Sequence, residues 1–389
     1  MRTHAPTAVV LGAGVNLIEV VRSLSLADVP TATVAPARDA ARLSRHATAI
    51  ATVEWSDHAA AAAQENLVDR LLEWARTQPA PPALLFTSDE ALLFVSRCRE
   101  PLQTAFRFAI ADADSIHALV DKVRFAPLAT SLGLLVPTTR VATPGPGRPP
   151  EHLQTLGFPM IVKPYRRDRL WHEVVHTRQK ATLVADEDGL ERLWARLAPL
   201  AAPVVLQASV TGPESRLESY HVYVDERGTI AAEFTGRKIR TLPAAYGHTT
   251  ALAITDTPDV LSRGRQLVEM LRLRGVAKVD FKRAPDGTLF LLEVNPRFHL
   301  WHHPGARAGV NMPAIMYADL TGRPRPPVQR ARAGVRWVHP QDVIAAQAAG
   351  MPPLRWLRWA HGCEAKAFWA WNDPLPLIGA VASRLVPGR

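Results

Sequence analysis

Hydrophobic and polar residues alternate along two neighbouring stretches in the last third of the chain. Val276–Lys282 alternates with a period of two, Ala284–Gly287 has the composition of a turn, and Leu289–Val294 is a second apolar run. This pattern predicts a β-hairpin, in which residues i and i+2 of one strand face the same way. If the hairpin folds symmetrically about its turn, Asp280 lies directly opposite Glu293.

The predicted hairpin gathers polar side chains at one point. Lys278 shares a face with Asp280, Asn295 shares a face with Glu293, and Arg297 follows at the rim. Two neighbouring carboxylates repel each other unless a cation lies between them, and oxygen ligands of this kind suit Mg²⁺. The alternative is a surface hairpin with a solvated charged face. The run LFLL before Glu293 favours a buried strand instead.

The first part of the chain, residues 7–110, predicts an α/β domain with parallel strands. Its expected strands are Ala8–Leu11, Thr31–Val34 and Ala83–Phe86. A helical pattern is expected through Ile18, Val21 and Leu24, and further helices at Ala59–Arg76 and Leu92–Arg99. The Gly12–Gly14 turn lacks the third glycine of a dinucleotide fingerprint, because Leu17 stands there, so a structural turn is favoured. Ser88, Asp89 and Glu90 follow a strand, at the edge where open α/β sheets bind ligands; alternatively, Ser88 or Asp89 caps the next helix.

The middle of the chain predicts helices and strands with basic residues at their ends. We expect a helix that starts at 112–115 and continues to about Gly133, a strand Met160–Val162 that ends in Lys163, and a helix over 188–198. The stretch 203–215 is expected as a buried strand that runs into a turn, followed by a strand–turn–strand unit with its turn at Asp225–Gly228. Further helices are expected at Ser262–Leu273 and about 313–320.

Composition narrows the class of protein. The 389 residues are 47% apolar and 21% charged, and no apolar run is long enough to span a membrane. The N-terminus is short and runs directly into a strand, so we expect no signal peptide there. Two separated cysteines, Cys98 and Cys363, indicate a reducing, cytoplasmic setting. The net charge of +10 favours a polyanionic ligand, either a nucleotide, a nucleic acid or an anionic membrane surface.

Two clusters of aromatic and histidine residues remain. His299, His302 and His303 lack ligand spacing and are expected on a loop, which favours substrate contacts or packing over a metal site. The tail 337–389 carries several tryptophans, for which packing onto the body is the first expectation, ahead of a partner surface or a substrate cover.

The order of these motifs resembles the ATP-grasp superfamily. A TSDE strand edge, a DK-containing helix, GFPMIVKP, VVLQASVTGPE, VDF and EVNPR follow one another over about residues 8–322. The carbamoyl-phosphate-synthase-like and D-alanine–D-alanine-ligase-like branches, the carboxylate–amine ligases, are the most similar. The resemblance implies an N-terminal parallel-sheet (pre-ATP-grasp) domain at 1–111 and a two-lobed ATP-grasp domain at 112–322. Its small lobe is expected at about 125–205 and its large lobe at about 206–322, with 323–389 as a Pro/Arg/Trp-rich C-terminal segment.

The resemblance also implies roles for particular residues. Lys122 and Lys163 resemble the phosphate-binding lysines, and Glu214 resembles the ribose-binding acid. The segment with Gln207, Ala208 and Val210 resembles the hinge that reads adenine. Asp280, Glu293 and Asn295 resemble the ligands of Mg²⁺, with Mn²⁺ as an alternative ion. The residues similar to catalytic ones are Arg297, Lys278 and Lys238.

One loop departs from the pattern. Relatives have a glycine- or serine-rich loop after the phosphate-binding lysine, whereas Tyr165–Val174 has no glycine and three arginines. Either these side chains replace the backbone cradle of the phosphates, or the loop binds an acidic substrate.

The resemblance predicts a cytoplasmic, ADP-forming ligase that joins a small carboxylate to an amine through an acyl phosphate. Amino acids or short peptides are the expected substrates. The alternative is a carboxylase or purine-pathway-type ligase that uses bicarbonate or another small acid; a more remote one is a non-catalytic polyanion-binding protein. Nucleic acid is not an expected partner, because no nucleic-acid-binding module is present. A homodimer is expected only by analogy with relatives.

Overall fold

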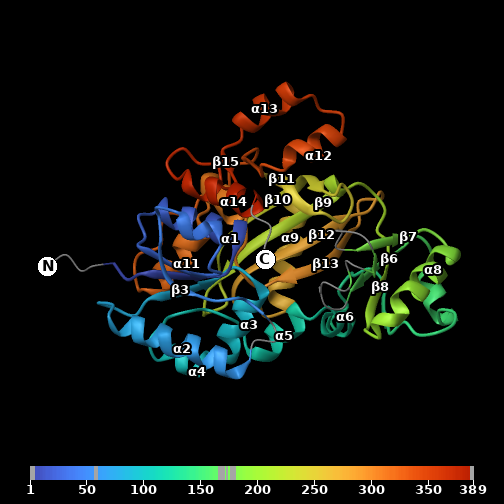
Figure 1. Cartoon of the computed structure of the whole chain (residues 1–389), viewed down its shortest axis with the longest axis horizontal. Coiled ribbons are helices and arrows are strands. Elements are labelled where there is room, and N and C mark those ends of the chain that lie inside the picture. The colour runs from blue at the N-terminus through green and yellow to red at the C-terminus, as the bar shows by residue number, and fades with distance from the viewer. Residues whose placement is uncertain (1–4, 57–59, 165–170, 172–173, 176–180, 386–389) are drawn as a thin grey trace.

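Figure 1 shows three β-sheets side by side along the long axis of the molecule. The computed structural model describes residues 5–56, 60–164, 171, 174–175 and 181–385, and of these it leaves the side chains of Lys122 and residues 382–385 undescribed. One sheet is parallel and the other two are mainly antiparallel. The predicted combination of α/β and α+β architecture is therefore confirmed.

The N-terminal sheet has the strand order β3-β2-β1-β4, and all its strands are parallel, as predicted. Its strands are β1 (Ala8–Leu11), β2 (Thr31–Ala35), β3 (Thr48–Thr52) and β4 (Ala83–Phe86). Its helices are α1 (Gly14–Ser25), α2 (Ala61–Arg76), α3 (Asp89–Arg97) and α4 (Arg99–Gln103), and the 3₁₀ turn η1 (Ala40–Leu43) follows β2. Successive residues of β1 face opposite sides, so Val10 packs in the core that contains α1 and Val9 in the core that contains α2. The strand β3 was not predicted from the sequence; it is a short edge strand in which only Ala51 is buried.

The seven-stranded sheet has the order β13-β12-β9-β10-β11-β14-β15. Its strands are β9 (Leu217–Val224), β10 (Ile230–Leu242), β11 (His248–Thr255), β12 (Gly275–Arg283), β13 (Leu289–Asn295), β14 (Arg336–Val338) and β15 (Ala365–Lys366). One face packs on α9 (Pro258–Met270), and the other packs on α10 (His302–Arg307) and α11 (Met312–Leu320). The helix α9 begins earlier than predicted, because Pro258 is well suited to a first helical turn.

The third sheet is small and antiparallel, with the order β5-β8-β6-β7. Its strands are β5 (Thr139–Ala142), β6 (Met160–Pro164), β7 (Thr182–Val184) and β8 (Val204–Ala208). The amphipathic helix α8 (Glu187–Leu197) covers one face and buries Leu190, Leu193 and Trp194 against it. The 3₁₀ turns η2 (Glu151–Leu156) and η3 (Ala198–Leu200) contact β8 and α8, respectively. A further 3₁₀ turn, η4 (Glu214–Arg216), precedes β9 and contacts β10 of the seven-stranded sheet.

The helix predicted to continue from residues 112–115 is broken in two. The observed helices are α5 (Ala113–Val120) and α6 (Lys122–Ser131). Asp121 between them has an extended backbone, and its carboxylate accepts the N–H groups of Val123 at 2.8 Å and Arg124 at 3.2 Å. An aspartate that caps a new helix competes with continuation of the old one, which a hydrophobic pattern alone does not reveal.

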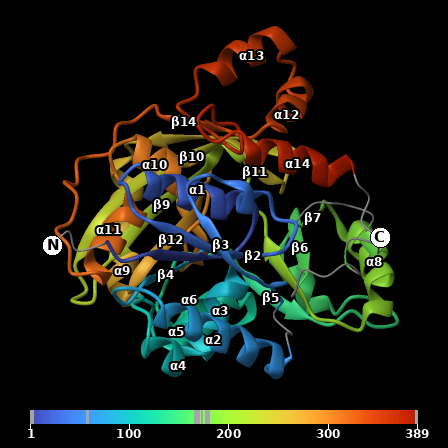
Figure 2. The same cartoon turned by 60° about the vertical axis from the view of Figure 1, so that its left-hand side comes forward.

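The C-terminal segment packs onto the body, as expected. Strand β14 pairs with β11, and β15 pairs with β14, so the tail extends the seven-stranded sheet. Between these strands, α12 (Asp342–Ala348) and α13 (Pro353–His361) rise above the sheet in Figure 1. The last helix, α14 (Leu375–Leu385), lies near α1 in Figure 2. Just before it, Asp373 forms a buried ion pair of 3.2 Å with Arg22 of α1. Within the described residues, no helix has the length and apolar character needed to cross a membrane.

Candidate active site

The register of the β12–β13 hairpin confirms the central prediction. Asp280 pairs with Glu293 and Lys278 pairs with Asn295 across the two antiparallel strands. The register shifts between Asp280 and Phe281, which indicates a β-bulge beside Glu293. The bulge lets two successive residues, Leu292 and Glu293, both line the same cavity.

The expectation that β13 is a buried strand is wrong. The strand lies at the edge of its sheet, where only Leu291 and Val294 are buried and Glu293 is exposed. Edge position, rather than sequence hydrophobicity, decides this, because one side of an edge strand has no neighbouring strand. This position suits a ligand-binding residue, because the Glu293 side chain is exposed while its backbone is held by pairing with β12.

Asp280 is a buried carboxylate with two partners. The hydroxyl of Ser219 donates to Oδ1 at 2.5 Å, and the ammonium group of Lys278 donates to Oδ2 at 2.5 Å. Only 4% of Asp280 is exposed, so this charge depends on those donors. The three residues face one side of the sheet, because Ser219 pairs directly with Asp280 on the neighbouring strand.

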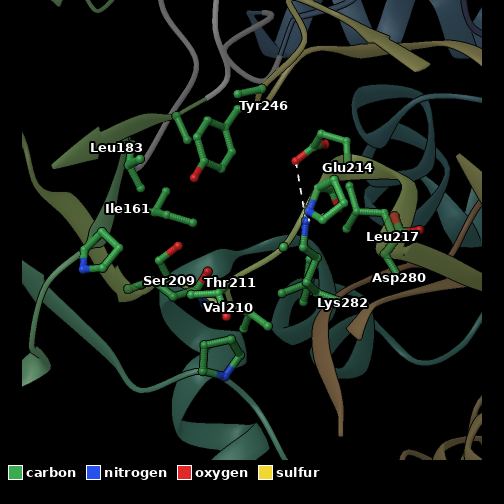
Figure 3. Close-up of a pocket in the computed structure, with 18 of the residues that line it drawn as sticks. Ile161, Leu183, Ser209, Val210, Thr211, Glu214, Leu217, Tyr246, Asp280 and Lys282 are labelled. Carbon is green, nitrogen blue, oxygen red and sulfur yellow. Dashed lines mark hydrogen bonds and ion pairs between the residues drawn. The ribbon is translucent and has the colours of Figure 1, made fainter. Parts of the chain in front are cut away.

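A cavity of about 570 Å³ lies between the small sheet and the seven-stranded sheet. Figure 3 shows its walls, with Ile161 and Leu183 of the small sheet facing Glu214, Lys282 and Asp280 on the opposite side. The structure brings many of the predicted site residues together in this cavity: Lys163, Gln207, Ala208, Val210, Glu214, Lys238, Asp280 and Glu293. The predicted residues converge although they come from both antiparallel sheets and the segment that connects them.

Gln207 holds Lys163 in the cavity wall. Its Oε1 accepts from the Lys163 ammonium group at 2.8 Å, and its Nε2 donates to the hydroxyl of Thr139 at 3.1 Å. Gln207 is itself only 8% exposed, which fixes the amide between its two partners. The backbone N–H groups of Ala208 and Ser209 are used within the small sheet, by the carbonyls of Thr138 and Pro159.

The other predicted residues lie outside the cavity lining. Lys278 and Asn295 lie two residues along their strands from the facing carboxylates, and the Asn295 amide donates to Oε1 of Glu293 at 3.2 Å. Lys122 begins α6, but its side chain lies outside the described part of the chain. The segment Tyr165–Val174, on which the arginine-rich loop was predicted, also lies almost entirely outside the described residues.

Arg297 joins the hairpin to the N-terminal sheet. Its Nε donates to Oδ1 of Asp89 at 2.5 Å, and Asp89 follows β4. Burial lowers the pKa of Arg297, but the Asp89, Glu293 and Glu90 carboxylates outweigh this effect, so its pKa is raised. Ser88 caps α3 through the N–H of Ala91, which is the structural alternative foreseen for this edge. The same edge therefore also supplies the acidic partner of Arg297.

Several residues of the cavity were not predicted from the sequence, above all Lys282. The side chain of Lys282 lines the cavity two residues after Asp280 on β12, so the period of the strand was a usable signal. Tyr246 and its neighbours in the loop 244–247 also line the cavity, and no local motif indicates them. Burial raises the pKa of the Tyr246 phenol, so this side chain enters the site in its neutral form.

Two of the three predicted histidines, His299 and His302, are buried beside Lys278, where His221 of β9 joins them. His303 is half-buried and lies near Arg22 and Arg307 instead. His299 and His302 lie with ring centroids 4.5 Å apart, and His221 stacks on Phe234 at 4.4 Å. Within the described residues, no group of three or more His, Cys, Asp or Glu side chains is arranged to hold a metal ion. The expected loop position is partly wrong, because His302 begins the short helix α10. Burial lowers the pKa of all four imidazoles, His303 included, which favours a packing role for neutral rings.

A known family matches part of the chain, and solved structures show the fold of most of it. A family described as ATP-grasp in the biosynthetic pathway with Ter operon matches residues 224–343, which include the hairpin and its neighbouring strands. None of the curated proteins matches the chain by sequence.

Several solved structures are similar over most of the chain. An ADP complex of N5-carboxyaminoimidazole ribonucleotide synthetase has a TM-score of 0.63 and 14% identity, and the match covers 86% of this chain and 82% of that one. Biotin carboxylase from Campylobacter jejuni has a TM-score of 0.61 and 12% identity, with 86% and 75% covered. The biotin carboxylase domain dimer of Hydrogenobacter thermophilus 2-oxoglutarate carboxylase, solved with MgADP, ADP and bicarbonate, has a TM-score of 0.58 and 16% identity, with 85% and 73% covered.

Proposed function

Because this chain has the ATP-grasp fold, with an N-terminal parallel sheet before it, we propose that it is an ADP-forming ligase that activates a small acid with ATP. The acid is bicarbonate or another small carboxylate, and the acceptor is an amine. The observation that carries the proposal is the facing pair Asp280 and Glu293 at the wall of a cavity that also holds Lys163 and Lys238. The similar structures support a small acid, since their names are those of carboxylases and a carboxyaminoimidazole ribonucleotide synthetase.

The cavity residues divide into parts that suit the parts of ATP. Apolar side chains such as Ile161 and Leu183 form the wall that would accept the adenine ring, beside the segment 207–210. Glu214 lies where a ribose hydroxyl would find an acceptor. Lys163 and Lys238 are the point charges for phosphate oxygens, and the hydrogen bond from Lys163 to Gln207 orients one of them before ATP arrives.

The facing carboxylates fit a hard divalent cation. Asp280 and Glu293 offer carboxylate oxygens, and Asn295 adds an amide oxygen, which together suit Mg²⁺ that keeps substrate phosphates as its other ligands. When bound there, Mg²⁺ would neutralise negative charge on the ATP phosphates. Ser219 fixes the rotamer of Asp280 by its hydrogen bond, so this ligand is oriented in advance.

The reaction has two steps. An oxygen of the substrate acid attacks the γ-phosphorus, the bond to the β-phosphate oxygen breaks, and ADP leaves. The nitrogen of the acceptor amine then attacks the acyl carbon, loses a proton, and displaces inorganic phosphate. Lys278 and Arg297 lie beyond Glu293 on the side of the N-terminal sheet, where their charges would stabilise the acyl phosphate.

A second candidate is an amide ligase for amino acids or short peptides. At the start of α1, the N–H of Gly14 donates to Oδ2 of Asp39 at 2.6 Å. The carboxylate of Asp39 therefore occupies the place where a helix N-terminus would bind a ligand anion. This observation favours an acceptor that carries no phosphate group at that position, as an amino acid does.

The test is Mg²⁺-dependent ADP release, measured with bicarbonate and an amine panel, and separately with amino acids singly and in pairs. Lys163→Ala serves as the blank. ADP release that requires bicarbonate supports the first candidate, and release that requires a particular acid and amine together supports the second. An absence of ATP binding, with salt-sensitive binding to DNA or anionic lipid, would contradict both and favour a polyanion-binding protein. Sedimentation of the same samples tests the homodimer that the similar carboxylase domain suggests.

A further inference from the structure

Lys282 is a buried lysine in the wall of the cavity. It lies on β12 two residues after Asp280, so the two side chains point to the same side of the sheet. Only 6% of Lys282 is exposed. Burial lowers its pKa, and the neighbouring Lys238 and Arg216 act in the same direction, while Glu214 opposes them. An apolar side chain would fill this position at a lower cost of desolvation, which indicates that the charge has a task.

The contacts of Lys282 define that task. Its ammonium group donates to the carbonyl of Pro213 at 2.8 Å and lies 3.8 Å from Oε1 of Glu214. Figure 3 draws the ion pair as a dashed line across the cavity wall. Lys282 therefore contacts two successive residues, Pro213 and Glu214, where the segment that follows β8 enters the 3₁₀ turn η4.

Glu214 is left with acceptor capacity toward the cavity. Among the described residues, no donor forms a hydrogen bond with its carboxylate, and its side chain is 18% exposed. A carboxylate that is held by a cation on one side and open on the other is suited to accept hydroxyl groups from a ligand. Vicinal hydroxyls of a ribose are such donors.

We propose that Lys282 is a specificity-determining residue that orients the Glu214 carboxylate and thereby selects nucleotides by their ribose hydroxyls. This inference rests on the proposed function, because it takes the cavity to be the ATP site. Lys282 itself acts through Glu214 as a positioning residue. A hydrogen bond to a charged acceptor changes affinity by about tenfold to a hundredfold, so the ribose should be read at that level.

The experiment measures the dissociation constants of ATP, 2′-deoxy-ATP and 3′-deoxy-ATP by calorimetry. The unaltered protein should bind ATP at least about tenfold more tightly than one or both deoxy analogues. Lys282→Met and Glu214→Gln should each reduce the ratio of the affinity for ATP to that for the deoxy analogues toward one. They should do so chiefly by weakening the binding of ATP. The double variant should resemble the single variants, because both changes disable the same contact.

Lys238→Met is the matched control, since Lys238 lines the same cavity but carries the phosphate role. Lys238→Met should weaken the binding of all three nucleotides alike and leave the preference for ATP over its deoxy analogues unchanged. Lys282→Gln is a second variant that keeps a hydrogen-bond donor without the charge, for use if the methionine variant does not fold.

Three results would overturn the inference. They are an unchanged ribose preference in the folded Lys282 variants, an equal weakening of all three nucleotides, and an unaltered protein that binds ATP and its deoxy analogues equally well. If the unaltered protein binds no adenine nucleotide at all, the proposed function fails, which is a distinct outcome from any of these three.

Discussion

Lys278 and Asp280 lie two residues apart on β12 and form an ion pair of 2.5 Å with side chains that are only 11% and 6% exposed. A cation of the chain thus already sits against one of the carboxylates assigned to the metal. Its ammonium group and a divalent ion compete for the same oxygen and also repel each other.

Lys278→Met should therefore bind Mg²⁺ in the presence of ADP more tightly, by about tenfold, while ADP formation falls because a charge near the acyl phosphate is lost. Calorimetric titration with Mg²⁺ measures the first effect independently of turnover. Lys278→Arg is the control that keeps the charge and should retain weaker Mg²⁺ binding. Weaker Mg²⁺ binding in the methionine variant would show that Lys278 does not compete with the ion.

Glu293→Gln should abolish ATP turnover and leave the fold intact. The side chain is exposed at the sheet edge, so its conversion to an amide removes a ligand charge without opening the core. The measurements are Mg²⁺-dependent ADP release and the thermal midpoint. Asp286→Asn makes the same chemical change in the turn of the same hairpin and should leave activity unchanged. Full activity in the Glu293 variant would show that Glu293 is not a ligand of the metal ion.

The Asp89–Arg297 pair should couple the N-terminal sheet to the hairpin energetically. Removal of Asp89 leaves a poorly solvated guanidinium group without its closest partner, which we expect to cost about 2 kcal/mol after allowance for the 40% exposure of Asp89. Urea unfolding of Asp89→Ala, Arg297→Ala and the double variant forms a complete cycle. A coupling free energy above about 1 kcal/mol is expected, and strictly additive effects would mean that the contact stabilises nothing.

Glu19 of α1 should make stability fall as the pH rises. It is fully buried, and neither carboxylate oxygen has a hydrogen-bond partner among the described residues. Burial raises its pKa from 4.5 to about 7, against smaller opposing effects of Arg22 and Trp337. The folded chain therefore keeps a proton that the unfolded chain loses above pH 4.5. The contribution of Glu19 to the free energy of unfolding thus declines between pH 4.5 and 7 and stays constant above pH 7.

At pH 8, the pKa shift of Glu19 lowers the free energy of unfolding by about 3 kcal/mol. Glu19→Gln should be more stable than the unaltered protein at pH 8 by up to that amount and should differ little at pH 4.5, as measured by urea unfolding. Glu73→Gln, an exposed position on α2, is the control and should show neither effect. An unchanged pH slope in the Glu19 variant would contradict the assignment.

Sequence alone determined the features that depend on near neighbours in the chain. Period-two alternation and a turn of fixed composition set the β12–β13 hairpin, and with it the register that places Asp280 opposite Glu293. The parallel arrangement of the N-terminal strands followed in the same way, from strands that alternate with helical patterns.

The tertiary structure decided what depends on distant contacts. Asp89 meets Arg297, Asp373 meets Arg22, and Lys282 meets Glu214 only because separate sheets and segments pack together. It also set the exposure of Glu293, since the position of β13 at a sheet edge depends on which strands pair beside it. Local periodicity carries no information about such pairings, because their free energy comes from burial and charge neutralisation between segments far apart in the chain.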